Sequence, residues 1–462
     1  MASDISFLPR EIGEMVENYG TSLRLALVEE LEAEHAIFVQ DGNHGEYRPQ
    51  QNEFVSSGVP FVRPGNLVDG RIDLSGCDQI NEVAFNRVRK GIGKGGDIVL
   101  TTNATIGRIA ITPKDAPVFV TNPQTTVWRS TDSEVLDQYY LFCFMRSAGF
   151  QDQLRMHTGR NATFDYISLT KQRSLSIPLP PLIDQIKIAR ILGALDDKIE
   201  LNSRMNSTLE AMARVLFQSW FVNFDPVKRN AADLITRPED SLFPVSFEDS
   251  VLGDIPSGWN VTTLGDVLDV LETGRRPKGG VAGYSSGIPS VGAESIWGIG
   301  KFDYSKTKYV PTEFYEKTSA GRVGHNDVLL YKDGGKPGEF RPRVGLFGHG
   351  FPFDKFCINE HVFRMRSGSV GQIFLYFAVS DQRILDDFAN KGGKAAIPGI
   401  NQVDVRSTRI LMPDKRVLEE FNRQVTPWCD LMIQNAIQSR TLSNLRDALL
   451  PKLLSGEICL KK

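Results

Sequence analysis

Two stretches of the chain carry a hydrophobic pattern that is typical of paired helices. Residues 182–222 contain no proline, and apolar side chains recur there at alternating steps of four and three. This spacing lines up one stripe of side chains along a helix, as in a coiled coil. The stripe recurs at a constant offset, which is 233 residues from position 202 to position 435. We therefore expect two rods of about 60 Å, with seam positions Leu195, Ile199, Asn202, Leu209, Leu216, Trp428, Met432, Asn435, Leu442 and Leu449.

Each seam taken singly is also compatible with an amphipathic helix packed on its own domain. Two copies in register favour helices that pair with each other. Asparagine at the same seam position of both copies, Asn202 and Asn435, costs stability but fixes register and partner. Two equivalent units related by a pseudo-twofold axis predict an antiparallel pair, with a globular unit at each end. Pro427 predicts a kink or a delayed start in the second helix, because proline removes a helical hydrogen bond.

The rest of the chain is also duplicated. The segment that starts at Gly159 matches the segment that starts at Gly392, and Ile167 corresponds to Ile400. Upstream, residues 58–62 (GVPFV) match 287–291 (GIPSV), and residues 96–100 (GDIVL) match 326–330 (NDVLL). A period this long indicates two copies of a whole domain and not a solenoid of small units.

Within each copy the pattern is mixed. Short β-rich runs alternate with glycine-rich turns at residues 59–62, 97–100, 108–112, 118–120 and 125–128, and helices are expected near 136–147 and 371–387. The sequence thus predicts an α+β fold in which two tandem-repeated domains are separated by two long antiparallel coiled-coil helices. The expected boundaries are 1–181 for the first domain with an N-terminal helical extension to about residue 34, 182–224 for its helix, 225–256 for a linker without its own core, 257–413 for the second domain, and 414–456 for the second helix.

The sequence lacks the common catalytic motifs. The chain has no GxGxxG after a strand, no GxxxxGK[ST], no HExxH and no GxSxG. Asn122-Pro123-Gln124 superficially resembles the Asn-Pro-Pro-aromatic motif of amino-methyltransferases, but it lacks the aromatic residue that would stack on a flipped base. The equivalent Asn359-Glu360-His361 favours a turn at a strand end. We expect no catalytic residue and no metal site in this chain.

The polar signal lies in glycine-rich loops that carry cations and amides. Each loop alone is compatible with a solvated turn, but the loops stand at matching positions in both copies. Glycine lets a backbone approach a ligand, lysine and arginine meet phosphate or guanine, and asparagine pairs with adenine. The candidate DNA-binding residues are Asn43, His44, Arg48, Asn103, Arg108, Arg160 and Asn161 in the first copy, and Arg275, Arg276, Lys278, Lys332, Lys336, Arg341, Arg343, Lys391 and Lys394 in the second.

Charge and cysteine content narrow the class of protein. The net charge is −3, which argues against nonspecific coating of DNA but permits a local basic face. Residues 275–410 hold 20 Lys and Arg against 13 Asp and Glu, whereas residues 40–175 hold 15 against 14. Five scattered cysteines without a CxxC pair indicate reduced thiols. The sequence has no apolar run of membrane-spanning length and no signal peptide, so a cytoplasmic protein is expected.

One segment identifies a family. Residues 175–227 join a proline-rich lead, the run LGALDDKIELN and the close FQSWFVNFD in one order. This segment closely resembles the central conserved region of type I restriction-modification specificity subunits, and the repeat architecture resembles theirs over essentially the whole chain. In that family two target recognition domains are separated by two long antiparallel helices.

The resemblance implies a non-catalytic subunit that reads double-stranded DNA. Each recognition domain would read one half of a bipartite sequence, and the helices would set the spacer between the halves. Two methyltransferase subunits, which bind S-adenosylmethionine and methylate adenine N6, would dock on this chain. Two restriction subunits, which use ATP and Mg²⁺, would join to cut unmethylated DNA. The family does not supply the loop residues named above, which rest on glycine, charge and repeat position.

Two other classes of function were weighed. A DNA-modifying enzyme with its own methyltransferase centre lacks the required motifs in this sequence. A scaffold without a DNA role predicts loops without repeated basic or amide content. The interpretation as a type I specificity subunit also predicts that a half-subunit, cut at about residue 257, dimerises through its seam and reads a symmetric site.

Overall fold

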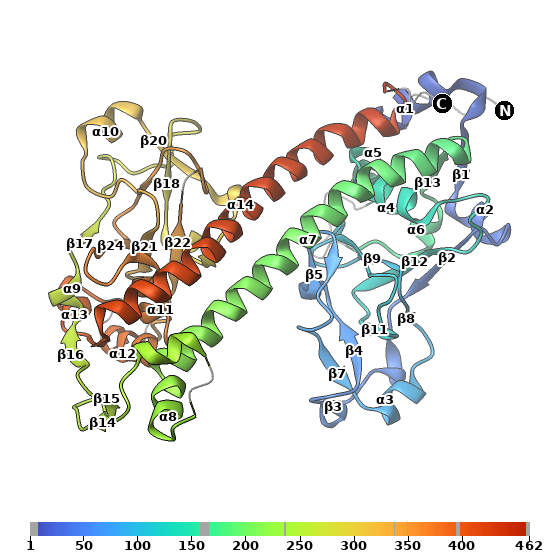
Figure 1. Cartoon of the computed structure of the whole chain (residues 1–462). Helices are drawn as coiled ribbons and strands as arrows, with labels where there is room; N and C mark the ends of the chain where they lie inside the picture. Colours follow the sequence, from blue (N-terminus) through green and yellow to red (C-terminus); the bar gives the residue numbers. More distant parts are fainter. Residues whose placement is uncertain are drawn as a thin grey trace. The chain divides into compact units, whose positions relative to one another are not determined.

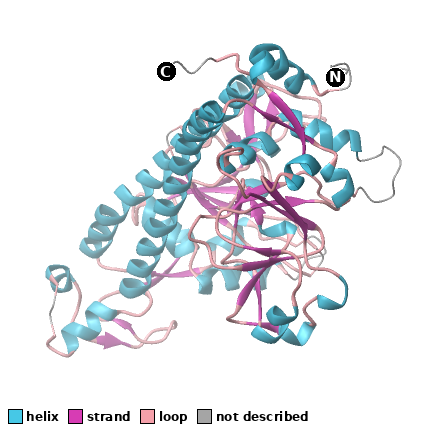
Figure 2. Ribbon diagram, turned by 90° about the vertical axis from the view of Figure 1, so that its right-hand side faces the viewer, coloured by secondary structure: helices cyan, strands magenta, loops and turns pink. Residues whose placement is uncertain are grey.

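The computed structural model describes residues 8–157, 166–234, 237–336, 338–348, 350–393 and 398–458. The chain folds into two compact units: Met1–Asp197 with Leu442–Lys462, and Lys198–Thr441. Both units mix helices with β-sheets, as the sequence predicted (Figures 1 and 2). The units divide inside the two long helices and not at the helix ends, because each unit includes one segment of each helix.

The long helices are α7 (Leu182–Phe221) and α14 (Lys415–Leu454), drawn green and red in Figure 1. Both begin within one residue of the expected position. The expectation of a delayed start before Pro427 was wrong, since α14 begins twelve residues earlier and continues through the proline. In the second unit, Asn202 donates to Gln438 Oε1 (2.9 Å) and Asn206 donates to the carbonyl of Met432 (2.9 Å). The contacts run in opposite directions along the two helices, so these segments are antiparallel.

The first unit contains two larger sheets and one strand pair. The strand order is β2-β12-β9-β10-β6-β5 in one sheet and β3-β7-β4-β11-β8 in the other, while β1 pairs with β13. The bounds of the first sheet are β2 (Ile37–Asp41), β12 (Thr125–Ser130), β9 (Ile98–Thr101), β10 (Ile109–Ile111), β6 (Arg71–Ile72) and β5 (Leu67–Val68). Those of the others are β3 (Phe54–Val55), β7 (Asp78–Ile80), β4 (Val59–Val62), β11 (Phe119–Thr121), β8 (Ile92–Gly93), β1 (Arg24–Leu27) and β13 (Ser176–Leu179). The short runs predicted as strands are all strands.

The second unit follows the same scheme. Its sheets have the orders β17-β24-β21-β22-β19 and β20-β18-β23, and β16 pairs with β25. In the larger sheet of each unit the central pairings are antiparallel, while β10 pairs with β6 and β22 pairs with β19 in parallel. The smaller sheets contain a parallel pairing as well, β4 with β11 and β18 with β23. The strand bounds are β17 (Val270–Thr273), β24 (Val362–Arg366), β21 (Asp327–Tyr331), β22 (Val344–Phe347), β19 (Gly298–Ile299), β20 (Lys308–Val310), β18 (Ile288–Val291), β23 (Cys357–Ile358), β16 (Asn260–Thr263) and β25 (Arg409–Met412).

Helices cover each main sheet. In the first unit these are α4 (Gln138–Arg146) and α5 (Ala148–His157), and in the second α11 (Gln372–Val379) and α12 (Gln382–Gly392). The expected single helix over 371–387 was wrong. The first helix ends at Val379, and Asp381 caps the second by accepting a hydrogen bond from the Arg383 amide, which is the usual role of aspartate before a helix. Shorter helices at equivalent strand ends are α3 (Glu82–Arg87), α6 (Leu169–Arg173), α9 (Leu264–Val267), α10 (Thr312–Lys317) and α13 (Gln402–Arg406).

Two further expectations need correction. The N-terminal extension is not wholly helical. Strand β1 lies between α1 (Arg10–Tyr19) and α2 (Val28–Ala33), and it pairs with β13. The linker is not a bare crossing segment, because it packs into the core of the second unit. It forms α8 (Asp225–Ala231) and the hairpin of β14 (Phe247–Glu248) and β15 (Ile255–Pro256), and its Val227, Phe243 and Ile255 are buried in the second unit.

Candidate nucleic-acid interface

In the first unit a glycine joins the loop at residues 41–49 to the segment around Asn122. Gly42 donates its amide to the carbonyl of Thr125 (2.8 Å), and the Asn43 amide donates to the carbonyl of Thr121 (2.8 Å). A Cβ atom on Gly42 would lie 1.8 Å from the carbonyl oxygen of Asn122. Only glycine therefore fits at the start of the 41–49 loop.

The second unit repeats this junction. Gly274 donates to the carbonyl of Asn359 (3.2 Å), and a Cβ atom there would lie 1.6 Å from the carbonyl oxygen of Ile358. A second glycine, Gly91 in one unit and Gly321 in the other, stands beside each junction with φ of +74° and +77°. The close approach of the two backbone segments is thus built in both copies by the same residue type.

The remaining loops join at the same place. In the first unit the Thr102 amide donates to the carbonyl of Gln124 (2.8 Å), and the Ile167 amide donates to the carbonyl of Thr102 (3.0 Å). In the second unit Lys332 donates to His361 (2.9 Å) and Ile400 donates to Lys332 (2.9 Å) through the equivalent backbone atoms. We call each group of joined loops a loop cluster: residues 41–49, 101–108 and 122–124 with 166–167, and residues 274–280, 332–343 and 359–361 with 398–400.

The Asn-Pro-Gln segment is a turn inside the first cluster. Asn122 Oδ1 accepts a hydrogen bond from the Gln124 amide (3.1 Å), and Asn359 Oδ1 accepts one from the His361 amide (3.0 Å). A short asparagine side chain commonly closes such turns. The interpretation of both segments as turns is confirmed.

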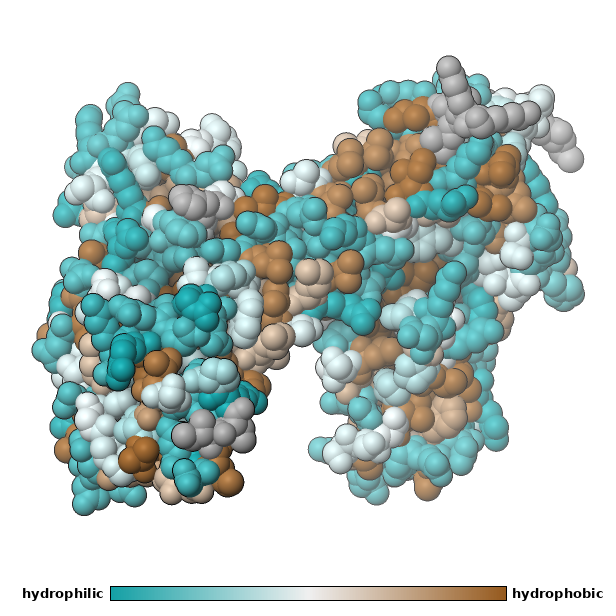
Figure 3. All heavy atoms as spheres, viewed as in Figure 1, coloured by the Kyte–Doolittle hydropathy of each residue, from teal (hydrophilic) through white to brown (hydrophobic). Residues whose placement is uncertain are grey.

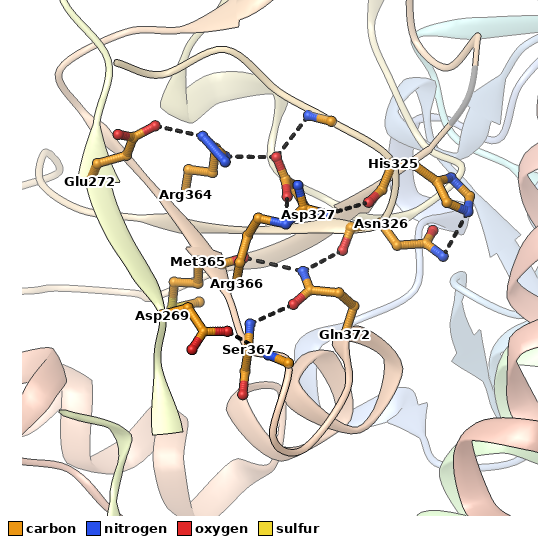
Figure 4. A network of polar contacts seen from close by, with 12 residues as sticks. Asp269, Glu272, His325, Asn326, Asp327, Arg364, Met365, Arg366, Ser367 and Gln372 are labelled. Atoms are coloured by element: carbon orange, nitrogen blue, oxygen red, sulfur yellow. Dashed lines mark hydrogen bonds and ion pairs between the residues drawn. The ribbon is translucent and has the colours of Figure 1, made fainter. Parts of the chain in front are cut away.

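A polar network fixes the opposite end of the central strands (Figure 4). Asp327, at the start of β21, is fully buried and pairs with Arg364 Nε (2.7 Å) and Arg366 Nε (3.0 Å). Burial raises the pKa of the Asp327 carboxyl above its ordinary value, although both guanidinium groups favour the charged form. Gln372 ties α11 to this end by accepting from Ser367 N and donating to the Asn326 carbonyl, both at 2.7 Å.

The first unit carries the matching network. Asp97, at the start of β9, accepts two hydrogen bonds of 2.5 Å from Arg129. Gln138 accepts from Ser130 N (2.5 Å) and donates to the Gly96 carbonyl (2.8 Å). Each loop cluster therefore stands at one end of strands whose other end is fixed by a buried carboxylate and a glutamine.

This chain is similar to known proteins. A family model described as the type I restriction modification DNA specificity domain matches residues 42–211, which include the first loop cluster and most of α7. The MjaIX specificity subunit of a type I restriction enzyme from Methanocaldococcus jannaschii is 25% identical over 88% of this chain and 88% of its own. The HindI specificity subunit from Haemophilus influenzae is 25% identical over 87% of this chain and 94% of its own.

The chain closely resembles the type I restriction-modification specificity subunits over most of its length. A crystal structure of the type I restriction-modification system S subunit from M. genitalium has the same fold, with a TM-score of 0.53 at 12% identity over 93% of this chain and 96% of that one. The general role of DNA sequence recognition follows from the family.

Several of the predicted DNA-binding residues have free side chains. They are exposed, and no partner of their side chains is found among the described residues. This set comprises His44, Arg48 and Arg108 in the first cluster and Arg275, Lys278 and Lys336 in the second. Asn103 is half-buried and lies opposite Tyr166 in an isolated β-bridge. Free donors at a loop surface are what contacts with phosphates and base edges require.

Two predicted residues have internal roles instead. Asn43 is 1% exposed and donates to the Tyr47 carbonyl (2.8 Å), so it shapes the loop and does not face outward. Lys391 donates to Asp387 Oδ2 (2.7 Å), the Asp404 carbonyl (3.1 Å) and Thr408 Oγ1 (2.8 Å), which ties α12 to α13. The donors of these two side chains are used inside the protein, so their predicted contact with DNA stays a prediction that this geometry does not support.

Four more cations of the second cluster have partners at its surface. Arg276 pairs with Glu360 (2.9 Å), Lys332 with Asp333 (2.8 Å), and Arg341 with Glu339. Arg343 lies over the rings of Trp297 and Tyr331, 4.2 and 4.7 Å from their centroids, and burial lowers its pKa. Arg160, Asn161 and Lys394 lie outside the described residues.

Sequence reasoning missed two aromatic residues. Tyr166 is 47% exposed and follows the loop that begins at residue 158, and Trp297 is 52% exposed beside Arg343. Exposed aromatic rings next to cations are suited to contacts with sugars and bases. Tyr166 could have been found from its position in the sequence, because it precedes Ile167, which corresponds to Ile400 in the second copy.

The described part of the chain holds no group of His, Cys, Asp and Glu that could bind a metal ion. Among the described helices, none is long and apolar enough to cross a membrane. Cys77, Cys143, Cys357 and Cys429 are buried free thiols, as expected, and Cys459 lies outside the described residues.

Proposed function

We propose that this specificity subunit reads a bipartite DNA sequence, with one loop cluster on each half-site. The recognition domains would be residues 1–181 and 257–413, and the helices 182–224 and 414–456 would form a coiled-coil ruler that sets the unread spacer. The observation that carries this proposal is the repetition of the loop cluster, with the same backbone hydrogen bonds in both units. A duplicated reading element is what a target with two halves requires.

The side chains in the clusters support a division of labour. Arg48, Arg108, Arg275, Lys278 and Lys336 would contact phosphates or guanine edges, since arginine and lysine are the usual partners of both. Asn103 would pair with adenine, which offers one donor and one acceptor to an amide.

The chain would contribute no catalytic centre. Adenine N6 is reached by a methyltransferase only after the base leaves the helical stack, and the base then needs an enclosing pocket. We propose that two methyltransferase subunits with S-adenosylmethionine supply that pocket, and that two restriction subunits with ATP and Mg²⁺ complete a cytoplasmic complex. Exposed apolar residues along the long helices support docking there. They include Ile183, Leu201, Met212, Val215 and Leu445. Figure 3 shows hydrophobic patches on the surface of the helices.

Co-expression with the methyltransferase subunit of its own operon tests the function. N6-methyladenine in the host DNA is mapped by single-molecule sequencing. We expect one bipartite motif that disappears when this chain is omitted. As a control, Arg10→Ala removes an exposed cation of α1 that pairs with Glu14, and we expect the methylated motif to remain the same. A stable complex that methylates no new site would contradict the proposal and favour a scaffold.

A further inference from the structure

The end of α14 fills a seat in the first unit. Leu453 and Leu454 are buried in one cluster with Ile188 and Tyr140, and Leu450 packs against it. Asn18 closes the seat by donating to the Ser455 carbonyl (2.8 Å). We call the residues around this helix end the first seat. Except for Tyr140, the side chains named in it are aliphatic.

The end of α7 fills the corresponding seat in the second unit. Here the helix residues are aromatic: Phe217, Trp220 and Phe221 are all buried. Phe221 lies 5.0 Å from the ring centroid of Phe374 and 5.1 Å from that of Phe421. Trp220 also contacts Phe243 of the linker region at 5.1 Å. We call this the second seat.

The repeat makes the two seats directly comparable. With the offset of 233 residues, the helix-end residues Phe217, Trp220 and Phe221 correspond to Leu450, Leu453 and Leu454. On the wall of the seat, Phe421 corresponds to Ile188. At these aligned positions the second seat pairs rings with a ring, whereas the first pairs aliphatic groups with an aliphatic group, although Tyr140 belongs to the same cluster.

Charge distinguishes the seats as well. In the first unit Arg446 Nη1 donates to Asp196 Oδ1 (2.6 Å), while Tyr139 Oη (2.7 Å) and Arg146 Nη1 (3.2 Å) donate to Asp196 Oδ2. The side chains of Arg446 and Asp196 are 14% and 10% exposed. At the equivalent positions the second unit has Ala213 and Cys429, both fully buried and uncharged.

We infer that each seat fits only the helix end that fills it, so size and charge together make the two repeats pair with each other and not with a second copy of themselves. This inference rests on packing and is independent of the proposed function. In a pair of two first repeats, Trp220 and Phe221 would enter the aliphatic seat, and Asp196 would face Ala213. Interiors are close-packed, so added rings force strain, and a buried charge without its partner is costly.

The inference revises one expectation from the sequence. A half-subunit cut at about residue 257 was expected to dimerise through its seam. The shared seam remains, but the first seat would have to accept the wrong helix end in both copies. Such a dimer is therefore expected to be much weaker than the pairing inside the full chain.

The test exchanges helix ends in the full chain. One variant carries Arg446→Ala, Leu450→Phe, Leu453→Trp and Leu454→Phe, which places the end of α7 in the first seat. Protection of amides from hydrogen exchange, followed by mass spectrometry, reports on each unit separately. We expect at least a tenfold loss of protection in α4, α5 and β13 and none in α11, α12 and β25. The matched control, Asn444→Phe, adds a ring to an exposed site of the same helix and leaves protection unchanged. Equal protection in the exchanged variant and the control would overturn the inference.

A second measurement decides the charge component and needs no added bulk. Arg446→Ala is made alone, and again together with Asp196→Ala. We expect Arg446→Ala alone to lower the protection of the first unit at least tenfold. In the chain that already carries Asp196→Ala, the same change should have less than half that effect on a logarithmic scale. Additive effects would show that the two groups do not act as a pair and would overturn this component. Lys415→Ala, in an exposed pair with Glu419 on the same helix, is expected to change nothing.

Discussion

The two units of this protein share backbone hydrogen bonds between their loops but have different side chains at two places. The hydrogen bonds of Thr102 and Ile167 recur at Lys332 and Ile400. By contrast, the loops and the helix seats have diverged. Backbone hydrogen bonds do not depend on the side chain, so a duplicated frame can keep its geometry while the surface it presents changes.

The loops differ in charge as well as in sequence. The free donors of the first cluster are His44, Arg48 and Arg108, with the amide of Asn103 beside them. Those of the second are all lysine and arginine, within a region whose balance is 20 cations to 13 acids. The second unit is therefore expected to hold DNA more through phosphate charge, and the first more through hydrogen bonds to specific groups.

Removing one large side chain from each seat has the largest expected effect on this comparison. Trp220→Ala should lower the free energy of unfolding of the second unit by about 3–5 kcal/mol, and Leu453→Ala that of the first by about 2–5 kcal/mol. Denaturant titration with hydrogen exchange assigns each loss to a unit. If either variant lowered the protection of both units equally, the seats would not be separate structures.

The sequence predicted the frame well, for a physical reason. Repeats, proline positions and hydrophobic periods are signals in the sequence itself, and they correctly located α7, α14 and five strands of the first unit. The broken helix at Asp381 was missed because its apolar pattern continues across the N-cap. The linker was misjudged because its few apolar residues, such as Phe243, are buried against large side chains on either side of it, Trp220 and Trp259.

The candidate site was predicted less well than the frame. Glycine and charge located the loops that the structure brings together, but they could not separate free from bonded side chains. Asn43 and Lys391 have the same residue types as true surface donors, and only their neighbours Tyr47 and Asp387 show that they are used internally. Tyr166 was missed because one exposed aromatic residue has no periodic signature.

Loop variants sharpen the contrast in charge. In a complex with the methyltransferase subunit, Arg275→Ala with Lys278→Ala should reduce the slope of log affinity against log salt by about one per lost phosphate contact. Arg48→Ala with Arg108→Ala should reduce this slope less and relax the methylated motif more, at a cost of about 1–3 kcal/mol per base contact. Fluorescence anisotropy at several salt concentrations measures the slopes. Equal slopes for both pairs would remove the proposed difference between the units.

The seam asparagines offer a smaller effect on stability and a clear effect on register. Asn202 donates to Gln438, Asn435 donates to Asn206 Oδ1 (2.9 Å), and Asn202 Oδ1 is buried without a partner. Asn202→Leu with Asn435→Leu should therefore raise the stability by about 1 kcal/mol. It should also permit a second spacer length in the methylated motif.

Thermal unfolding and methylation mapping measure the two effects of the asparagine variant. Ser203→Leu, at an exposed position of α7, serves as the control. Unchanged spacer preference in the double variant would show that the register is set elsewhere, for example by the pair of Asp196 and Arg446.

The smallest expected effect concerns acid and the outer edge of each loop cluster. In the first unit Arg87 donates to Glu53 Oε1 (2.8 Å) and to the carbonyl of Arg48 (3.1 Å), and this guanidinium lowers the pKa of Glu53 to about 2. In the second unit Arg322 instead donates to the carbonyls of Tyr315 (2.7 Å) and Thr318 (2.9 Å), which do not titrate.

Because the pKa of Glu53 is depressed in the folded protein, its contribution to stability is present above the ordinary value of 4.5 and is lost as the pH falls towards 2. Amide protection factors, corrected for intrinsic exchange, should therefore decrease over this range for residues 45–53 but not for residues 315–322. Glu53→Gln should have low protection at every pH and no dependence on acid. Parallel acid responses of both segments in the wild-type chain would show that the loops are held by something other than these two arginines.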